Sequence, residues 1–181
     1  MIAGGVDLIQ LRGKAQTLEQ LTEIAAKLHT ITSRAEIPLI INDHALVAQS
    51  VPLEGVHVGQ DDDPVAVARK KAGGVLLVGK STHSFEQALA AQREGADYIG
   101  FGPIFATPTK PDYQAIGLKE INRAHVAVTL PIFCIGGIKL ENLEQVLTAG
   151  AGRVAIVSGL LKAADLIEYA RACKKLLTAD V

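Results

Sequence analysis

The sequence predicts an α/β protein, a (β/α)8 barrel of the TIM type that lacks its first strand in these 181 residues. Seven short β-type runs alternate with helical patterns along the chain. The runs are nearly continuous in apolar, β-branched residues, as in a parallel sheet covered on both faces. Polar residues gather where the runs end, which is the edge at which such barrels carry their active sites. No linker divides the chain, so we expect one barrel domain over residues 1–181.

The composition indicates a folded protein and narrows the classes of partner. Hydrophobic residues make up 49% and charged residues 20%, with a formal net charge of −1. Nothing in this balance points to nucleic acid or to a membrane surface as the main partner. The two cysteines form neither a disulfide framework nor a metal site, which favours a cytoplasmic location. A homo-oligomer is left open.

The elements follow from hydrophobic periodicity. The strands are predicted at 6–12, 38–42, 55–58, 75–79, 97–101, 131–135 and 153–157. Helical spacing runs through 18–28, 65–68, 85–89, 143–147 and 166–170, and residues 1–5 are expected to be the tail of a helix.

Three of the helices have readable starts. Thr17 with Gln20 is expected to form a capping box, and Ser84 with Gln87 likewise. Asp63 is expected at the N-cap position, with Pro64 as the first helical residue.

The first predicted strand turns polar on one face. By period two, Gln10 and Arg12 share the face that points into the barrel, and Lys14 lies just beyond. The alternative is that Arg12 and Lys14 are solvated loop charges. Their place beside Gln10, on a face otherwise meant for the core, favours a functional role.

Acidic residues follow the next two strands. Asn42 and Asp43 end one strand, and 61–63 is an aspartate run after the other. Carboxylates at adjacent strand ends can share a hard cation such as Mg²⁺, which completes its shell with phosphate oxygens. One aspartate of the run is also expected to cap the following helix. His57, in mid-strand, is expected to be a hydrogen-bonded core residue.

The later strands end in residues suited to anions. The segment after the fifth strand carries Thr107, Thr109 and Lys110 between prolines, which suggests a loop that grips an anion. The last two strands end in glycine turns at 136–137 and 158–159. In a barrel these are the seventh and eighth strands, where phosphate binds to backbone N–H groups.

Seven stretches in this order resemble the thiamine phosphate synthase and thiazole tautomerase family over nearly the whole chain. They are residues 10–14 (QLRGK), 42–43 (ND), 55–62 (GVHVGQDD), 81–84 (STHS), 102–110 (GPIFATPTK), 135–138 (IGGI) and 157–158 (VS). The resemblance implies a barrel enzyme, a transferase that joins hydroxymethylpyrimidine diphosphate to a thiazole phosphate and releases pyrophosphate.

The resemblance also implies a role for each matching residue. The pyrimidine diphosphate would be held by Gln10, Arg12, Lys14, Asn42 and Ser81. Asp43 and Asp62 would bind Mg²⁺. The thiazole phosphate would be served by Thr107, Thr109, Lys110, Gly137, Val157 and Ser158. Arg12, Lys14, Ser81 and Lys110 would act on the diphosphate during the reaction.

The chemistry agrees with these roles. A diphosphate leaves more readily when Mg²⁺, Arg12 and the lysines neutralise the charge that develops on it. The family's picture is dissociative: diphosphate leaves first and the thiazole nitrogen then attacks, so no protein nucleophile is expected.

Two alternatives stay open. One is a thiazole tautomerase with His83 as its acid–base group, which would leave the diphosphate and Mg²⁺ residues without a purpose. The other is a non-catalytic barrel that binds thiazole phosphate. The preferred form of the thiazole is also open.

Overall fold

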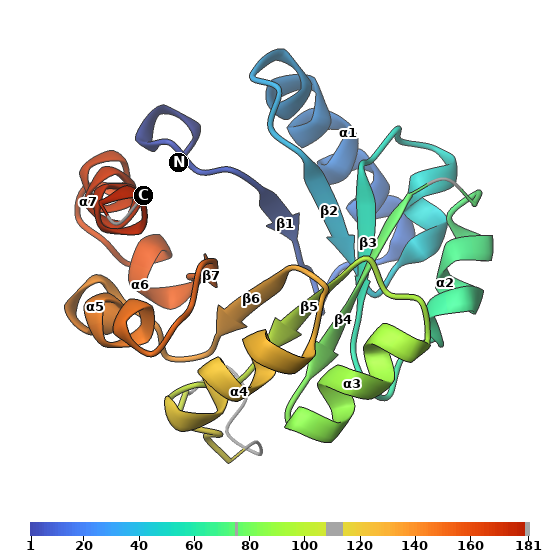
Figure 1. The fold of residues 1–181 in the computed structure, drawn as a ribbon. Coiled ribbons are helices and arrows are strands. Elements are labelled where there is room, and N and C mark those ends of the chain that lie inside the picture. The colour runs from blue at the N-terminus through green and yellow to red at the C-terminus, as the bar shows by residue number, and fades with distance from the viewer. Residues whose placement is uncertain (75, 108–113, 180–181) are drawn as a thin grey trace.

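The computed structural model describes residues 1–74, 76–107 and 114–179, and these form a curled parallel sheet with helices on its outer face (Figure 1). Seven strands lie side by side in chain order within this described part. They are β1 (Ile9–Leu11), β2 (Leu39–Asn42), β3 (Gly55–Val58), β4 (Leu77–Thr82), β5 (Tyr98–Phe101), β6 (Ile132–Ile135) and β7 (Val154–Ala155). The predicted α/β class and every predicted strand are confirmed, although β1 and β7 are shorter than expected.

The helices cover the convex side of this sheet (Figure 1). They are α1 (Leu18–Arg34), α2 (Val65–Lys71), α3 (Phe85–Arg93), α4 (Lys119–Ala127), α5 (Leu140–Thr148), α6 (Ser158–Leu161) and α7 (Leu166–Thr178). Short 3-10 helices occupy Ile2–Gly4 and Ala45–Gln49. The sequence did not predict α4, whose inward face is reduced to Ile121 and Ala124. It also did not predict α6 or the turn at Ala45–Gln49.

The strand register decides which side chains face inward. Ile9 pairs with Leu39 and Gln10 with Ile40. Ile9 and Leu39 belong to the hydrophobic core between sheet and helices, so Gln10 and Ile40 face the barrel interior. The predicted inward position of Gln10 is therefore confirmed.

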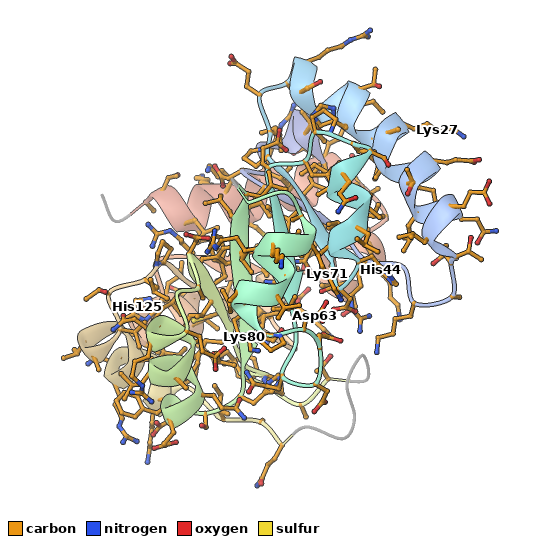
Figure 2. All side chains as sticks on the ribbon, turned by 90° about the vertical axis from the view of Figure 1, so that its right-hand side faces the viewer. Lys27, His44, Asp63, Lys71, Lys80 and His125 are labelled. Carbon is orange, nitrogen blue, oxygen red and sulfur yellow. The ribbon has the colours of Figure 1, made fainter. Side chains whose placement is uncertain are left out.

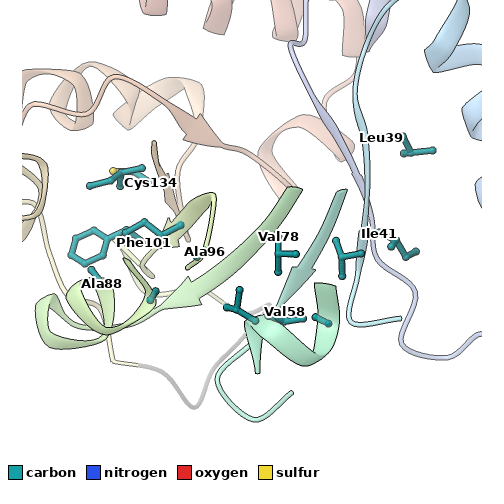
Figure 3. Packing of buried hydrophobic residues seen from close by; sticks show 14 of the residues in the cluster. Leu39, Ile41, Val58, Val78, Ala88, Ala96, Phe101 and Cys134 are labelled. Carbon is teal, nitrogen blue, oxygen red and sulfur yellow. The ribbon is translucent and has the colours of Figure 1, made fainter. Parts of the chain in front are cut away.

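The main core lies outside the sheet rather than within the barrel. Leu39, Val58, Val78 and Phe101 point from successive strands toward the helices and are fully buried (Figure 3). Burying such side chains is the chief favourable contribution to folding. Because this core lies between the sheet and the helices, the inner face of the sheet can carry polar side chains.

Two of the three helix starts differ from the prediction. Thr17 forms the capping box, with Gln20 N–H donating to its Oγ1 at 3.2 Å and Thr17 N–H donating to Gln20 Oε1 at 3.0 Å. Ser84 accepts from Gln87 N–H at 3.2 Å, but the Gln87 side chain accepts from His83 N–H at 2.7 Å, so the reciprocal bond is not made to Ser84.

The start of α2 corrects a prediction. Pro64, not Asp63, occupies the N-cap position and Val65 begins the helix. Asp63 instead forms an ion pair with Lys71, at 2.8 Å between Oδ2 and Nζ (Figure 2). Among the described residues, no side chain makes a capping hydrogen bond at this helix start.

The chain start lies against α7, near the two edges of the sheet (Figure 1). The 3-10 helix at Ile2–Gly4 ends in Gly5, whose φ of 86° is left-handed. Gly4 packs so closely that a Cβ there would be 2.5 Å from Ala170 Cβ. In the described part of the chain β1 and β7 are the sheet edges and do not pair with each other. None of the helices in that part is long and apolar enough to cross a membrane.

Candidate active site

Two carboxylates lie together after β2 and β3, and the charge of Arg12, which follows β1, acts on one of them. Asp43 follows β2 in a left-handed conformation, with φ of 66°, and its N–H donates to His57 O at 2.8 Å. Asp62 follows β3, and its Oδ2 accepts from Gly59 N–H at 2.7 Å. Asp43 is within hydrogen-bonding range of Asp62 and within electrostatic range of Arg12. The structure thus brings together three of the predicted site residues.

This cluster disfavours the charged form of Asp43. Burial, together with the hydrogen bond and charge of Asp62, raises the pKa of Asp43, while Arg12 and His44 oppose the shift. Two carboxylates held this close are stabilised by a cation between them. Their oxygens are the ligand type that Mg²⁺ prefers, so the residues fit that ion.

The protein supplies few ligands to such an ion. Across residues 1–74, 76–107 and 114–179, no group of three or more His, Cys, Asp or Glu side chains gathers as a metal site. A cation at Asp43 and Asp62 would therefore complete its shell with water or phosphate oxygens, as Mg²⁺ commonly does.

Ser81 is held from two sides at the end of β4. Its Oγ lies 2.9 Å from His57 Nε2, and its carbonyl accepts from Gln60 Nε2 at 2.5 Å. Lys80, the residue before it, points the other way and lies 3.7 Å from Glu94, so it takes no part in the inner face (Figure 2).

A buried hydrogen-bond chain crosses the inner face below these groups. His57 Nδ1 lies 3.1 Å from Tyr98 Oη, and the Gln10 side chain is near enough to the Tyr98 hydroxyl to oppose the rise in its pKa. Burial raises the pKa of Tyr98, so its phenol is neutral. His57 is only 7% exposed, in agreement with the hydrogen-bonded core residue expected from the sequence. The chain connects side chains of β3, β4 and β5.

Tyr98 has its place because position 79 has no side chain. A Cβ built at Gly79 would lie 2.1 Å from the Tyr98 ring. The ring also packs edge-on against Phe133, with centroids 5.5 Å apart. The sequence analysis missed Tyr98 and Gln60. The signal that could have indicated Tyr98 is the glycine on an inward position of the neighbouring strand.

The glycine turn after β6 is locked to the segment after β5. Gly136 and Gly137 have φ of 93° and 67°, in the left-handed region that favours glycine. Phe105 N–H donates to Gly136 O at 3.0 Å, and a Cβ at Gly137 would lie 2.7 Å from Phe105 Cβ. The backbone at Gly137 is therefore closely confined.

The other predicted site residues are distributed around the same edge of the sheet. Asn42 is 8% exposed at the end of β2, in register with His57. Arg12 and Lys14 are exposed after β1, Thr107 is half-buried, and Val157 and Ser158 stand at the start of α6. Thr109 and Lys110 lie outside the described residues.

His83, the acid–base group of the alternative function, is half-buried after β4. Its Nδ1 lies 2.6 Å from the carbonyl oxygen of Gly102. This contact fixes the ring orientation and makes Nδ1 the protonated nitrogen.

Comparisons with known proteins give a consistent result. Residues 1–160 match the family model described as thiamine monophosphate synthase. A thiamine-phosphate synthase of Chloroflexus aurantiacus is 47% identical over 178 residues, which are 98% of this chain and 82% of that protein. One of Halalkalibacterium halodurans is 45% identical over 166 residues, 91% of this chain and 79% of that protein.

Solved structures agree. A thiamine phosphate pyrophosphorylase from Pyrococcus furiosus superposes with a TM-score of 0.92 at 31% identity, covering 98% of this chain and 86% of that one. A 3-hexulose-6-phosphate synthase, at 20% identity and a TM-score of 0.72 over 97% of this chain and 89% of that one, shares the fold alone. The matched family segment spans every described strand and each predicted site residue.

Proposed function

The chain belongs to the thiamine monophosphate synthase family and is an enzyme of that family, and we propose that it joins hydroxymethylpyrimidine diphosphate to a thiazole phosphate with release of pyrophosphate. The observation that carries this choice of substrates is the cluster of Asp43, Asp62 and Arg12. It stands at the same sheet edge as the glycine turns after β6 and β7. Such an edge can accept one ligand with a diphosphate and a second with a phosphate.

The diphosphate is assigned to the ends of β1 to β4. Asp43 and Asp62 would hold Mg²⁺, which when bound neutralises negative charge on the diphosphate. Arg12 and Lys14 add positive charge from β1, and Arg12 is already within electrostatic range of Asp43. Gln10 and Asn42 face the interior, where they can hydrogen-bond the pyrimidine ring.

Ser81 serves as a fixed donor to the diphosphate. Its hydroxyl is oriented by His57 and its backbone by Gln60. A side chain held this way needs little reorganisation when charge develops on the leaving group, which is how preorganised donors lower a barrier. The reaction requires no protein nucleophile, because positioning of the two substrates supplies the rest.

The thiazole phosphate is assigned to the ends of β5, β6 and β7. The confined backbone at Gly137 and the turn at Val157 and Ser158 offer N–H groups, and Thr107 adds a hydroxyl. By resemblance Thr109 and Lys110 complete this part, with Lys110 also near the departing pyrophosphate.

A direct assay tests the proposal. We expect purified protein with both substrates and Mg²⁺ to form thiamine phosphate and pyrophosphate in equal amounts, and chelation of Mg²⁺ to stop the reaction. Isomerisation of a thiazole carboxylate phosphate without that product would assign the protein to the tautomerase reaction through His83. Binding of thiazole phosphate with neither reaction would make it a non-catalytic barrel.

We also propose how the barrel closes and where the protein is located. We propose that residues 1–181 form one barrel domain and that a further strand, lying between β1 and β7, completes it to eight. The open sheet edges at β1 and β7 support this, because unpaired strand edges are normally covered. Cys134 and Cys173 are both free, which supports a reducing, cytoplasmic location.

A further inference from the structure

Tyr169 of α7 contacts the start of α5. The N–H of Leu140 donates to Tyr169 Oη at 2.7 Å. Leu140 is the first residue of α5, so its N–H is one of the four that have no partner within a helix. The hydrogen bond therefore connects α7 to the segment that follows the glycine turn at Gly136 and Gly137.

The same hydroxyl lies against the second glycine turn. A Cβ built at Gly159 would be 2.7 Å from Tyr169 Oη, and the next nearest atoms are Lys139 Cγ at 3.3 Å and Ile156 Cγ2 at 3.4 Å. Gly159 follows Ser158 in the first turn of α6, four residues after the end of β7. One side chain thus touches the backbone segments at the ends of both β6 and β7.

The turn after β6 is tied down from its other side by Asn142. Its Nδ2 donates to Gly137 O at 3.0 Å, and its Oδ1 accepts from Lys139 N–H at 2.8 Å. Together with Tyr169, these bonds fix the backbone of residues 137–140. The Leu140 N–H donates to the phenol, so a phosphate must use N–H groups of the two turns rather than the first N–H of α5.

We propose that Tyr169 is a positioning residue for the thiazole phosphate, whose hydroxyl sets the spacing between the turn at Gly136–Gly137 and the turn at Ser158–Gly159. This inference rests on the proposed function, since it assigns the phosphate of that substrate to the two turns. Tyr169 acts through backbone N–H groups and does not itself touch the reacting atoms. A small change in their spacing weakens every hydrogen bond to a phosphate held between them.

The test is the Tyr169→Phe variant, which removes only the hydroxyl. We expect the KM for the thiazole phosphate to rise about 3- to 10-fold, the effect of losing one hydrogen bond, with the KM for the pyrimidine diphosphate within twofold of wild type. A general loss of structure would move both. Arg171→Gln, an exposed residue of the same helix paired with Glu168, is the matched control and should change neither.

A second variant examines the contact with Gly159. Gly159→Ala should raise the same KM more than Tyr169→Phe does, because the methyl group meets the hydroxyl. In the double variant the hydroxyl is gone, and we expect the KM to return to that of Tyr169→Phe alone. If the increase in KM of the double variant is the product of the two single-variant increases, the proposed spacing role is wrong.

The inference and the proposed function fail in different ways. Calorimetric titration with the thiazole phosphate measures the site without turnover, and Tyr169→Phe should weaken binding by the same factor. A wild-type protein that binds the thiazole phosphate but forms no product would overturn the function only. Equal affinities of wild type and Tyr169→Phe, or no binding by wild type, would overturn the inference.

Discussion

The two halves of the candidate site would bind anions through different groups. The carboxylate half (Arg12, Asp43, Asp62 and Ser81, at the ends of β1 to β4) uses charged and polar side chains. The glycine half (Gly136, Gly137, Ser158 and Gly159, at the ends of β6 and β7) uses backbone. In the first half the pKa of Asp43 is raised, chiefly by burial and further by the neighbouring carboxylate of Asp62. In the second half, the left-handed backbone and the close packing at Gly136 and Gly137 require glycine at these positions.

This difference indicates which perturbations each half will register. The carboxylate half should respond to changes of charge and to Mg²⁺, and should tolerate changes of shape that keep its hydrogen bonds. The glycine half should respond to added volume and to backbone strain, and should respond less than the carboxylate half to added salt. Variants matched in size or in charge can separate the two.

The largest effect is expected from removal of positive charge in the carboxylate half. Arg12→Ala should lower kcat by about 100- to 1,000-fold, as does loss of one preorganised charge-stabilising group elsewhere. Asp43→Ala should act similarly while the fold persists, as circular dichroism can verify. Arg34→Ala, at the exposed end of α1, is the control, and a normal rate for Arg12→Ala would refute the proposed role of the guanidinium.

A large effect of another kind is expected from added volume in the glycine half. Gly137→Ala should raise the KM for the thiazole phosphate about 10-fold and cost about 1–3 kcal/mol of stability, because φ is 67° and the methyl group meets Phe105. Gly73→Ala is the control: its φ is 94°, but a Cβ there meets nothing within 4 Å. It should lower stability and leave both KM values unchanged.

A smaller effect should expose the repulsion between the two carboxylates. Asp43→Asn removes one charge, and asparagine tolerates the left-handed backbone at this position. Without Mg²⁺ the variant should be more stable than wild type by about 0.5–1 kcal/mol in urea unfolding. Mg²⁺ with inorganic pyrophosphate should raise the melting temperature of wild type only.

If Asp43→Asn is instead less stable without Mg²⁺, the carboxylate is already compensated by its protein neighbours. The two carboxylates would then not need a cation to offset their repulsion. This result would contradict the proposed difference between the carboxylate half and the glycine half.

The smallest effect is expected one residue along the aspartate run. Asp63 forms an exposed ion pair with Lys71, and such pairs contribute little. Asp63→Asn should change stability by less than about 0.5 kcal/mol and leave kcat within twofold. Asp62→Asn should reduce kcat by about 100-fold in the same assay, and equal rates for the two variants would contradict the assignment of Asp62.

The strands could be predicted from the sequence because their outward residues form a continuous apolar pattern. The helix α4 could not, since most of its nine residues (KEINRAHVA) are polar and only Ile121 and Ala124 are buried. Asp63 and Ser84 show a second limit. Capping patterns identify where a helix begins, but a competing partner such as Lys71 or His83 N–H decides which side chain makes the bond.

The candidate site divides in the same way. Asp43, the aspartate run 61–63 and Arg12 could be placed at one edge because each follows a strand and parallel strands end at one edge, and the family resemblance singled out Asp62 within the run. Tyr98 and Tyr169 could not, because their partners are distant in sequence: Tyr98 bonds to His57, 41 residues away, and Tyr169 to Leu140, 29 residues away. Contacts of that kind depend on how strands and helices pack.

The contact between Gly79 and the Tyr98 ring also constrains how this sequence can diverge. A side chain at position 79 would occupy the space that the Tyr98 ring fills. A larger residue at 79 is therefore tolerated only after the ring at 98 has been lost. Losing the ring first removes the hydroxyl that lies 3.1 Å from His57 Nδ1. Tyr98 must therefore be replaced before Gly79 can be. A protein at that intermediate step has lost the Tyr98 hydroxyl and has not yet gained a side chain at position 79.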